Sequence, residues 1–234
     1  MGVVWNKKAK PSIMIAMPCH DSVKINTMLS IIKLIQQVSF PSGRKGIPIG
    51  INTMKSSMVH QARNYLVSEF MATEYTHLLF VDSDVEFEPD AVLRMLLSNK
   101  DIICTPYRLK DPDLSRATYN VALKKDAVRE GDNIEIIAGP TGLMLIKRGV
   151  FTKIIELHPE LKITNPAIKN PGKSHDFYYN FYNFGFEDGY LIGEDVSFCK
   201  LAIKSGFKLY ANVASVTQHH GSYAWEGRYQ DEME

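Results

Sequence analysis

The arrangement of apolar residues in the first hundred positions restricts this chain more than any other feature. Short apolar runs of strand length alternate there with segments whose apolar residues recur at helical spacing. The strand-like runs are Ile13–Met17, Ile47–Ile51, Thr76–Val81 and Asp101–Cys104, and the helix-like segments are Val23–Val38, Ser57–Met71 and Pro89–Leu97. Because alternating strands and helices build parallel sheets with helices on their faces, we expect an α/β fold with an open, mostly parallel twisted sheet.

The second half of the chain follows a different pattern. Strand character is found in Ile134–Ile137, Leu143–Ile146 and Lys208–Ala211, and helical spacing in Val150–Leu157 and Glu194–Lys204. No internal repeat and no low-complexity linker separates the two halves of the sequence. We therefore expect one domain over residues 1–234, in which about residues 12–110 form the alternating half and about residues 111–221 add a small mixed sheet.

Two aspartates follow the third strand-like run directly. The sequence Phe80-Val81-Asp82-Ser83-Asp84 passes from apolar residues to two carboxylates that are one residue apart. In open α/β sheets, ligands bind beyond the carboxyl ends of the strands. Carboxylate oxygens placed there suit Mg²⁺ or Mn²⁺, and such an ion can bridge the phosphates of a nucleotide. The sequence therefore predicts a metal and phosphate site at Asp82, Ser83 and Asp84.

Other interpretations of the same motif lead to different functions. An aspartate at a strand end also serves as the cap of the following helix. A calcium loop of the EF-hand type is excluded, because its sixth and twelfth positions hold Phe87 and Leu93 here instead of glycine and glutamate. A haloacid-dehalogenase-like phosphatase also carries an Asp-x-Asp motif, with the first aspartate as nucleophile. That motif lies on the first strand of such a phosphatase, whereas two strand–helix units precede Asp82 here.

A second acidic pair opens the last helical segment. Glu194 and Asp195 follow Gly193 and precede the helical run of residues 196–204. Acidic residues are common in the first turn of a helix because they complement its dipole, so the pair alone indicates little. Combined with the Asp-x-Asp motif upstream, a carboxylate at this position suits a general base that takes a proton from an attacking hydroxyl. We expect Asp195, with Glu194 beside it, to be catalytic.

Two adjacent histidines, His219 and His220, follow the last strand-like run. A lone histidine is more often a packed or hydrogen-bonded residue than a ligand, but a pair in a chain with a metal motif makes one of them a candidate metal ligand. Imidazole is a softer ligand than carboxylate, so its participation favours Mn²⁺ over Mg²⁺. The sequence does not distinguish between the two histidines.

Several further residues lie where a nucleotide or sugar would be held. His20 and Asp21 follow the first strand-like run and are candidates for contacts with a base or ribose, although a simple turn explains them equally well. Arg63 lies on the polar side of a helix, from which its guanidinium either clamps a diphosphate or faces solvent. Gly142 allows a sugar to approach the backbone closely. The aromatic and asparagine-rich residues 177–186 suit sugar recognition, or else cover the sheet.

The bulk properties exclude several classes of protein. Lysine and arginine number 27 against 26 aspartates and glutamates, so the charge balance does not indicate a nucleic-acid partner. Cys19, Cys104 and Cys199 are too scattered for a disulfide framework, which fits a reducing compartment. No apolar run reaches the roughly 20 residues of a transmembrane segment, and the first ten residues lack the apolar core of a signal peptide. We expect a cytoplasmic protein.

Together these motifs resemble those of GT-A fold glycosyltransferases, most closely the family 2 type found in bacteria, phages and large viruses. The resemblance covers about residues 12–221 and rests on the order and spacing of pieces that are weak individually. These pieces are the region of Pro18, Gln61-Ala62-Arg63-Asn64, Phe80-Val81-Asp82-Ser83-Asp84, Thr141-Gly142-Leu143-Met144 and Gly193-Glu194-Asp195-Val196-Ser197-Phe198-Cys199. The aromatic-acid signature that usually follows the catalytic pair is absent, so the resemblance does not indicate the acceptor.

The resemblance implies a GT-A fold with a nucleotide-binding first half and an acceptor-side second half. It implies that Asp82 and Asp84 hold Mn²⁺, or Mg²⁺, against the diphosphate of a UDP- or GDP-linked sugar. His219, or less readily His220, would be a late metal or diphosphate ligand. Asp195 would be the base of an inverting, hexosyltransferase-type reaction on a hydroxyl of a glycan or another acceptor. The alternatives are the phosphatase above, a nucleotidyltransferase, and a non-catalytic sugar-binding module.

Overall fold

The computed structural model describes residues 10–41, 46–113, 115, 117–164 and 172–233. In the first part of the chain, strands and helices alternate as the apolar pattern predicts, with one further short strand, β4. The elements are β1 (Ile13–Cys19), α1 (Ile25–Ser39), β2 (Ile49–Lys55), α2 (Val59–Met71), β3 (His77–Val81), β4 (Val85–Phe87), α3 (Pro89–Ser98) and β5 (Ile102–Cys104).

The second part is richer in short strands than the apolar pattern predicts. Its strands are β6 (Ala122–Leu123), β7 (Arg129–Glu130), β8 (Asn133–Ala138), β9 (Leu143–Lys147), β10 (Gly185–Glu187), β11 (Tyr190–Ile192), β12 (Leu209–Asn212), β13 (Thr217–His220) and β14 (Ala224–Gly227). Its helices are α4 (Arg148–Leu157), α5 (Glu194–Lys204) and the 3₁₀ turns η1 (Pro159–Leu161), η2 (Gly172–Phe177) and η3 (Tyr229–Glu232). No helix in the described ranges is both long and apolar enough to cross a membrane.

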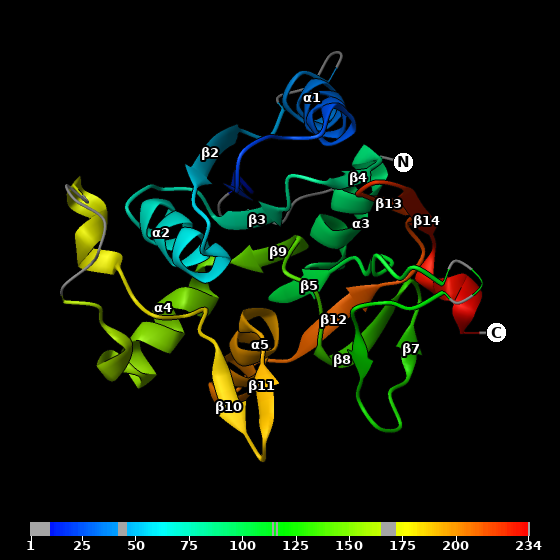
Figure 1. Ribbon diagram of the computed structural model, residues 1–234. Coiled ribbons are helices and arrows are strands. Elements are labelled where there is room, and N and C mark those ends of the chain that lie inside the picture. Colours follow the sequence, from blue (N-terminus) through cyan, green and yellow to red (C-terminus); the bar gives the residue numbers. More distant parts are fainter. Residues whose placement is uncertain (1–9, 42–45, 114, 116, 165–171, 234) are drawn as a thin grey trace.

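Nine strands form one central sheet. Its hydrogen-bonded neighbours follow the order β2-β1-β3-β9-β5-β12-β8-β6, with β7 beside β8. β1 pairs in parallel with β2 and β3, and β5 pairs in parallel with β12. β9 runs antiparallel between β3 and β5, and β8 runs antiparallel to β12. The expectation of a large, mostly parallel sheet flanked by helices is confirmed, with β8 and β9 as reversed strands (Figure 1).

Within the described residues, the second half of the chain does not build a mixed sheet of its own. β9 enters the middle of the central sheet, where Leu143–Ile146 is buried. Such a continuous apolar run is expected in a strand that is covered on both faces, so its composition suits this position. The small three-stranded sheet consists of β14, β13 and β4 and thus takes one strand from the first half, while β10 and β11 form a separate hairpin.

Two clusters of buried side chains lie on opposite faces of the sheet. Alternate residues of the central strands divide between them, as the two-residue repeat of a strand requires. One cluster contains Met14, Ala16, Leu78 and Phe80 with residues of α2, α4 and α5, and the other contains Ile13, Ile15, Leu79 and Val81 with residues of α1 and α3. This two-sided burial explains why β1 and residues 78–81 of β3 are apolar, so that polar side chains come where the strands leave the core.

Candidate active site

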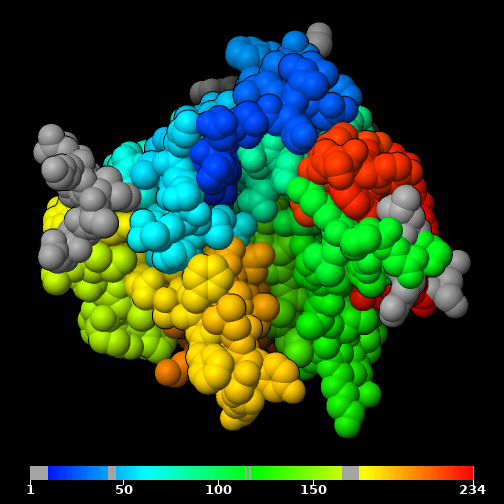
Figure 2. Space-filling view, viewed as in Figure 1, coloured from blue at the N-terminus to red at the C-terminus, as the bar shows by residue number. Residues whose placement is uncertain are grey.

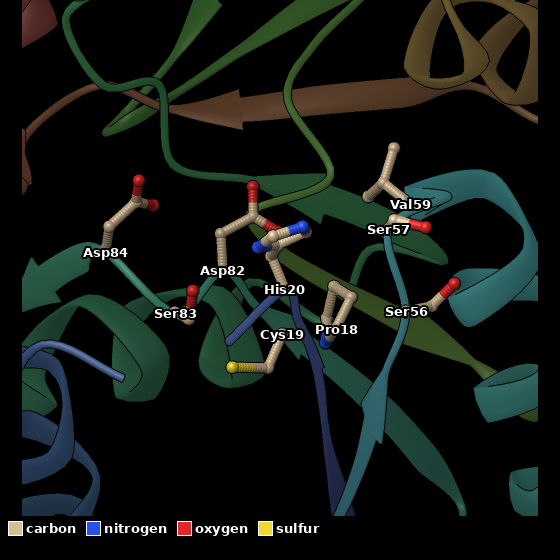
Figure 3. A pocket seen from close by; sticks show the side chains of 9 residues that line it. All are labelled: Pro18, Cys19, His20, Ser56, Ser57, Val59, Asp82, Ser83 and Asp84. Carbon is tan, nitrogen blue, oxygen red and sulfur yellow. The ribbon is translucent and has the colours of Figure 1, made fainter. Parts of the chain in front are cut away.

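A pocket lies at the ends of the central strands. Its lining comes from the end of β1, the segment that joins β2 to α2, and the residues after β3, namely Pro18, Cys19, His20, Ser56, Ser57, Val59, Asp82, Ser83 and Asp84. In Figure 3 the carboxylates of Asp82 and Asp84 project to the same side of the chain. In Figure 2, β1 (blue), α2 (cyan), α5 (orange) and the stretch after β5 (green) meet around a hollow. The two aspartates therefore lie beyond the carboxyl ends of central strands, as predicted.

The guanidinium of Arg63 joins this pocket to the second acidic pair. Arg63 Nη2 donates to Asp82 Oδ1 and Oδ2, at 3.1 and 3.3 Å. Arg63 Nη1 donates to Glu194 Oε1 at 2.8 Å and also to Asp195 Oδ1. The Arg63 side chain is only 3% exposed. One buried cation thus holds together carboxylates from the end of β3 and from the first turn of α5.

Packing of α2 against the sheet buries the part of the helix that carries Arg63. Arg63 and Asn64 are each 2% exposed, which excludes the alternative of a solvent-facing side. Asn64 Nδ2 donates to the carbonyl oxygen of Tyr182 at 2.9 Å, and Asn64 Oδ1 accepts the Tyr182 N–H at 2.8 Å. The Tyr182 ring lies 5.8 Å from the Arg63 guanidinium carbon. With its Nη atoms on carboxylates, Arg63 organises the acidic residues, instead of being free to clamp a diphosphate as predicted.

The site around Arg63 holds more negative than positive charge. Burial raises the pKa of Asp82, and the nearby Asp195 and Asp84 raise it further against the attraction of Arg63. Burial also raises the pKa of Glu194, again against Arg63. Burial acts to lower the pKa of Arg63, but the carboxylates outweigh it and raise that pKa. A second cation would relieve this excess of negative charge, and a divalent ion is the usual means in proteins.

Asp84 lies between a lysine and a histidine. Lys110 Nζ is 2.5 Å from Asp84 Oδ2, and His219 Nε2 is 3.6 Å from Asp84 Oδ1. Burial acts to raise the pKa of Asp84, but the contacts with His219 and Lys110 outweigh it and lower the pKa to about 2. Asp84 is therefore an anion at neutral pH, as a carboxylate that binds a cation must be.

The two histidines of β13 have different partners. His219 Nδ1 is 2.9 Å from the carbonyl oxygen of Arg108. When Nε2 gives up its proton as a cation binds, a proton on Nδ1 that is donated to this carbonyl leaves the Nε2 lone pair as the ligand, an arrangement common among metal-binding histidines. His220 Nε2 is 2.7 Å from Glu86 Oε2. Because neighbouring residues of a strand project to opposite faces, only His219 of the predicted pair is brought to Asp84.

The residues around Asp84 fit a divalent cation with part of a coordination shell. One ion can bridge the distance between Asp84 Oδ1 and His219 Nε2. Asp82 lies two residues earlier in the chain, at the same strand end. Within the described residues, no group of three or more histidine, cysteine, aspartate or glutamate side chains is already arranged to hold an ion. Mn²⁺ accepts both carboxylate and imidazole, and water or substrate phosphates often complete the shell of such ions.

Gly142 serves a purpose different from the predicted one. A Cβ atom at this position would lie closer than 3.0 Å to Asp82 Oδ2 and to the Tyr107 hydroxyl. The backbone N–H of Asp82 donates to the Gly142 carbonyl oxygen at 2.8 Å. The close approach that glycine permits is therefore used by the Asp82 carboxylate and Tyr107, not by a sugar.

Replacing Gly142 with alanine is expected to displace the Asp82 carboxylate and to lower the free energy of unfolding by about 1–3 kcal/mol, the usual range for forcing extra atoms into a packed site. Urea denaturation measures this change. Gly149→Ala is the matched control, because a Cβ there meets nothing within 4 Å and the residue lies in α4, where alanine is the better helix former. Equal effects of the two substitutions would contradict the role given to Gly142.

The remaining predicted contacts lie at the edge of the pocket. His20 lines it and is exposed. The Ser83 carbonyl oxygen accepts the backbone N–H of Lys24 at 2.9 Å, which ties the segment before α1 to the pocket. Asp21 is not part of the lining and pairs with Lys55 at 2.8 Å, in a surface contact in which both side chains are largely exposed. His20 and Ser83 thus line the pocket, whereas Asp21 is paired on the surface beside it.

The aromatic stretch of residues 177–186 divides into two parts. Tyr178, Phe181 and Tyr182 are at most 5% exposed, so this part covers the sheet. Phe184 and Phe186 are 44% and 74% exposed. Phe186 lies on β10, the hairpin strand that precedes α5 and the acidic pair. The most exposed aromatic rings of this stretch thus belong to its second part.

Two residues of the site carry no recognisable sequence signal. The Tyr107 hydroxyl donates to Asp82 Oδ2 at 3.3 Å. Burial raises the pKa of Tyr107 well above its ordinary value, and Asp82 raises it further, so the hydroxyl keeps its proton. Lys110, the partner of Asp84, lies in the same segment after β5. Neither residue belongs to a motif, and only the tertiary structure brings this segment to the aspartates.

Comparison with known proteins supports the fold more than the chemistry. No protein-family model matches the chain, and no curated protein is significantly similar to it. A solved structure described as the crystal structure of A197 from STIV is 21% identical, with a TM-score of 0.51, and the match covers 90% of this chain and 86% of that one. That likeness shows a shared fold.

Two further solved structures match more weakly. One is described as a glycosyltransferase involved in the glycosylation of the major capsid of PBCV-1, at 14% identity and a TM-score of 0.35 over 72% of this chain and 75% of that one. The other is 4-diphosphocytidyl-2C-methyl-D-erythritolsynthase from Anaerococcus prevotii DSM 20548, at 10% identity and a TM-score of 0.36 over 72% and 84%. Similarities at this level add nothing to the argument from the site.

Proposed function

We propose that this protein transfers a sugar from a nucleoside-diphosphate sugar to a hydroxyl of an acceptor, with a divalent cation, Mn²⁺ by preference, and with inversion at the anomeric carbon. One observation carries the proposal. The Asp-x-Asp pair at the end of a central strand is joined through buried Arg63 to the acidic start of α5, so a site for a phosphate-bound cation and a candidate base lie on two sides of one guanidinium.

The donor half of the reaction is assigned to the strand ends. Asp84 and His219 are the proposed cation ligands, and Asp82 is the second carboxylate beside the cation, held in place by Arg63 and Tyr107. When bound, the cation would act as a Lewis acid that offsets the charge developing on the departing diphosphate. His20 and the serines at the start of α2 are assigned to the nucleoside, because they line the pocket beside the aspartates.

The acceptor half is assigned to Asp195. Its side chain is 29% exposed, against 14% for Glu194, so Asp195 is the member of the pair more open to a substrate. Arg63 fixes its carboxylate through Oδ1. Asp195 takes the proton of the acceptor hydroxyl, whose oxygen forms the new bond as the diphosphate leaves from the opposite face of the sugar. Displacement from opposite faces inverts the anomeric centre.

The alternative chemistries make different use of Asp82. A phosphatase of the haloacid-dehalogenase type needs a free carboxylate oxygen there as nucleophile, but both oxygens of Asp82 contact Arg63, and Oδ2 also accepts from Tyr107. This favours a holding role for Asp82. A nucleotidyltransferase would release pyrophosphate from a nucleoside triphosphate, and a binding module would show no turnover.

The proposal is tested by thermal unfolding with UDP, GDP and their sugars, in Mn²⁺, in Mg²⁺ or in EDTA. A ligand at 100 times its Kd stabilises the native state by about 2.7 kcal/mol, which for a chain of this size raises the Tm by about 5–10 °C. We expect such a shift with one nucleoside diphosphate, and only with the metal present. No shift with any of these ligands in Mn²⁺ or Mg²⁺ would contradict the proposal.

Asp84→Asn is expected to abolish the metal-dependent part of this shift, because the amide keeps the shape of the carboxylate but not the charge that holds a cation. The same Tm measurement in Mn²⁺ checks it. Asp101→Asn is the matched control, since Asp101 also pairs with a lysine, Lys147 at 3.0 Å, but lies on the surface and 54% exposed. An unchanged shift in the Asp84 variant would remove Asp84 from the metal site.

A further inference from the structure

Residues before and after Lys110 in the sequence are held by contacts with β13 and β14. The carbonyl oxygen of Arg108 contacts His219 Nδ1 at 2.9 Å, and the carbonyl oxygen of Asp111 accepts the Trp225 indole N–H at 2.9 Å. A Cβ added to Gly221 would lie 3.3 Å from Lys110 Cδ, so the lysine stem passes close to this glycine. The segment after β5 and the β13–β14 hairpin therefore fix Lys110 and His219 together.

Lys110 and His219 lie next to different oxygens of the Asp84 carboxylate. The ammonium contacts Oδ2 at 2.5 Å, and the imidazole Nε2 faces Oδ1 at 3.6 Å. The Lys110 side chain is 34% exposed, and its ammonium ends on a carboxylate that lines the pocket. A cation bound between Oδ1 and His219 would thus have a fixed positive charge as its neighbour across one carboxylate.

We propose that Lys110 is a positioning residue for the donor diphosphate. Its positive charge opposes binding of the divalent cation alone and favours binding of the cation together with a diphosphate. This inference rests on the proposed function, because it concerns the same site. An ammonium beside the cation repels it, but the two positive charges together attract a diphosphate anion more strongly than the cation alone does. Cation and nucleotide then bind cooperatively, and the coupling is reciprocal.

The inference predicts opposite changes in two affinities when the charge of Lys110 is removed. In Lys110→Met we expect the Kd for Mn²⁺ alone to fall about tenfold, because the repulsion is lost. We expect the Kd for UDP or GDP in saturating Mn²⁺ to rise about tenfold, because one anion contact is lost. Titration calorimetry measures both constants, and Mn²⁺ electron paramagnetic resonance measures the first independently of any turnover.

Two further variants separate charge from packing. Lys110→Arg keeps a cation at this position and is expected to restore both constants toward those of the wild type. Lys124→Met removes another paired lysine, 2.6 Å from Glu135 on the surface, and is expected to change neither. Mn²⁺ and nucleotide affinities that fall together in Lys110→Met, or that both stay within about twofold of the wild type, would overturn the inference.

The failure of this inference can be distinguished from the failure of the proposed function. If the wild type binds Mn²⁺ but neither UDP nor GDP, the proposed donor is wrong. The Mn²⁺ titration of Lys110→Met still decides whether the lysine opposes the cation. If the wild type binds a nucleoside diphosphate with Mn²⁺ and Lys110→Met behaves identically, the proposed function stands and the role of Lys110 is refuted.

Discussion

Asp195→Asn is expected to lower kcat by about 10³-fold while donor binding stays nearly unchanged. General-base catalysis contributes about 10²–10⁴-fold to enzymatic rates, and asparagine cannot take the proton of an acceptor hydroxyl. Its side-chain oxygen can still accept from Arg63 Nη1, so the arrangement around the guanidinium is retained. The measurement is transfer from the nucleotide sugar identified by Tm shift, followed together with the Kd for that donor.

The control for Asp195→Asn is Asp188→Asn, the same chemical change in the turn between β10 and β11. Asp188 has a φ of +50°, a left-handed conformation that asparagine tolerates well. This variant is expected to keep full activity. Transfer at the wild-type rate by Asp195→Asn would show that another group is the base. A retained anomeric configuration in the wild-type product would also reject Asp195 as the base of a direct displacement.

Arg63→Met is expected to lower the free energy of unfolding at neutral pH by about 3–5 kcal/mol, the range found when one partner is removed from a buried ion pair. The substitution leaves Asp82, Glu194 and Asp195 close together without the cation that joins them. For a chain of this size the Tm falls by about 10 °C. Urea denaturation at several pH values measures the effect.

The pH dependence of this loss distinguishes charge from packing. The pKa values of Asp82 and Glu194 are already raised in the presence of Arg63. A group whose pKa is raised in the folded state contributes stability below its unfolded pKa, and this contribution is lost as the pH rises through the folded pKa. The deficit of Arg63→Met is therefore expected to be largest at neutral pH and smallest near pH 4.

A surface arginine provides the comparison for Arg63. Arg94 also pairs with two carboxylates, Asp90 and Asp132, but its side chain is 41% exposed. Arg94→Met is expected to change stability by less than about 0.5 kcal/mol, because exposed ion pairs contribute little. If Arg63→Met lost stability equally at all pH values, the loss would reflect packing of the side chain and not the charges around it.

Much of the fold could be predicted from the spacing of apolar residues. β3 and α2 lie within the ranges that the sequence indicates, β1 begins at the predicted residue and runs two residues further, and α5 begins and ends at the predicted residues. The order of strands could not be predicted in the same way. β9 lies between β3 and β5 although it comes later in the chain, and its apolar run is equally compatible with any strand that is buried on both faces.

The predicted place of the Asp-x-Asp motif at a strand end is confirmed, whereas several contacts around it could not be predicted. The Asp-x-Asp motif marks the point where a buried strand reaches the pocket, and such a change from apolar to charged residues is visible in the sequence. The choice between His219 and His220 depends on which face of β13 turns toward Asp84. The roles of Gly142 and Arg63 depend on which atoms lie next to them. Tyr107 and Lys110 belong to a segment with no motif.

The sequence by itself determined the alternation of strands and helices, the place of Asp82 and Asp84 at a strand end, and the acidic start of α5. These features depend on residues that are neighbours along the chain, where spacing and burial leave a local pattern. Only the tertiary structure decided that one buried guanidinium joins the two acidic pairs. It also decided that Lys110 and His219 lie next to different oxygens of Asp84. Those contacts link residues far apart in the sequence, and they form because folding brings charged groups together and removes part of their contact with water, so that each must find a partner.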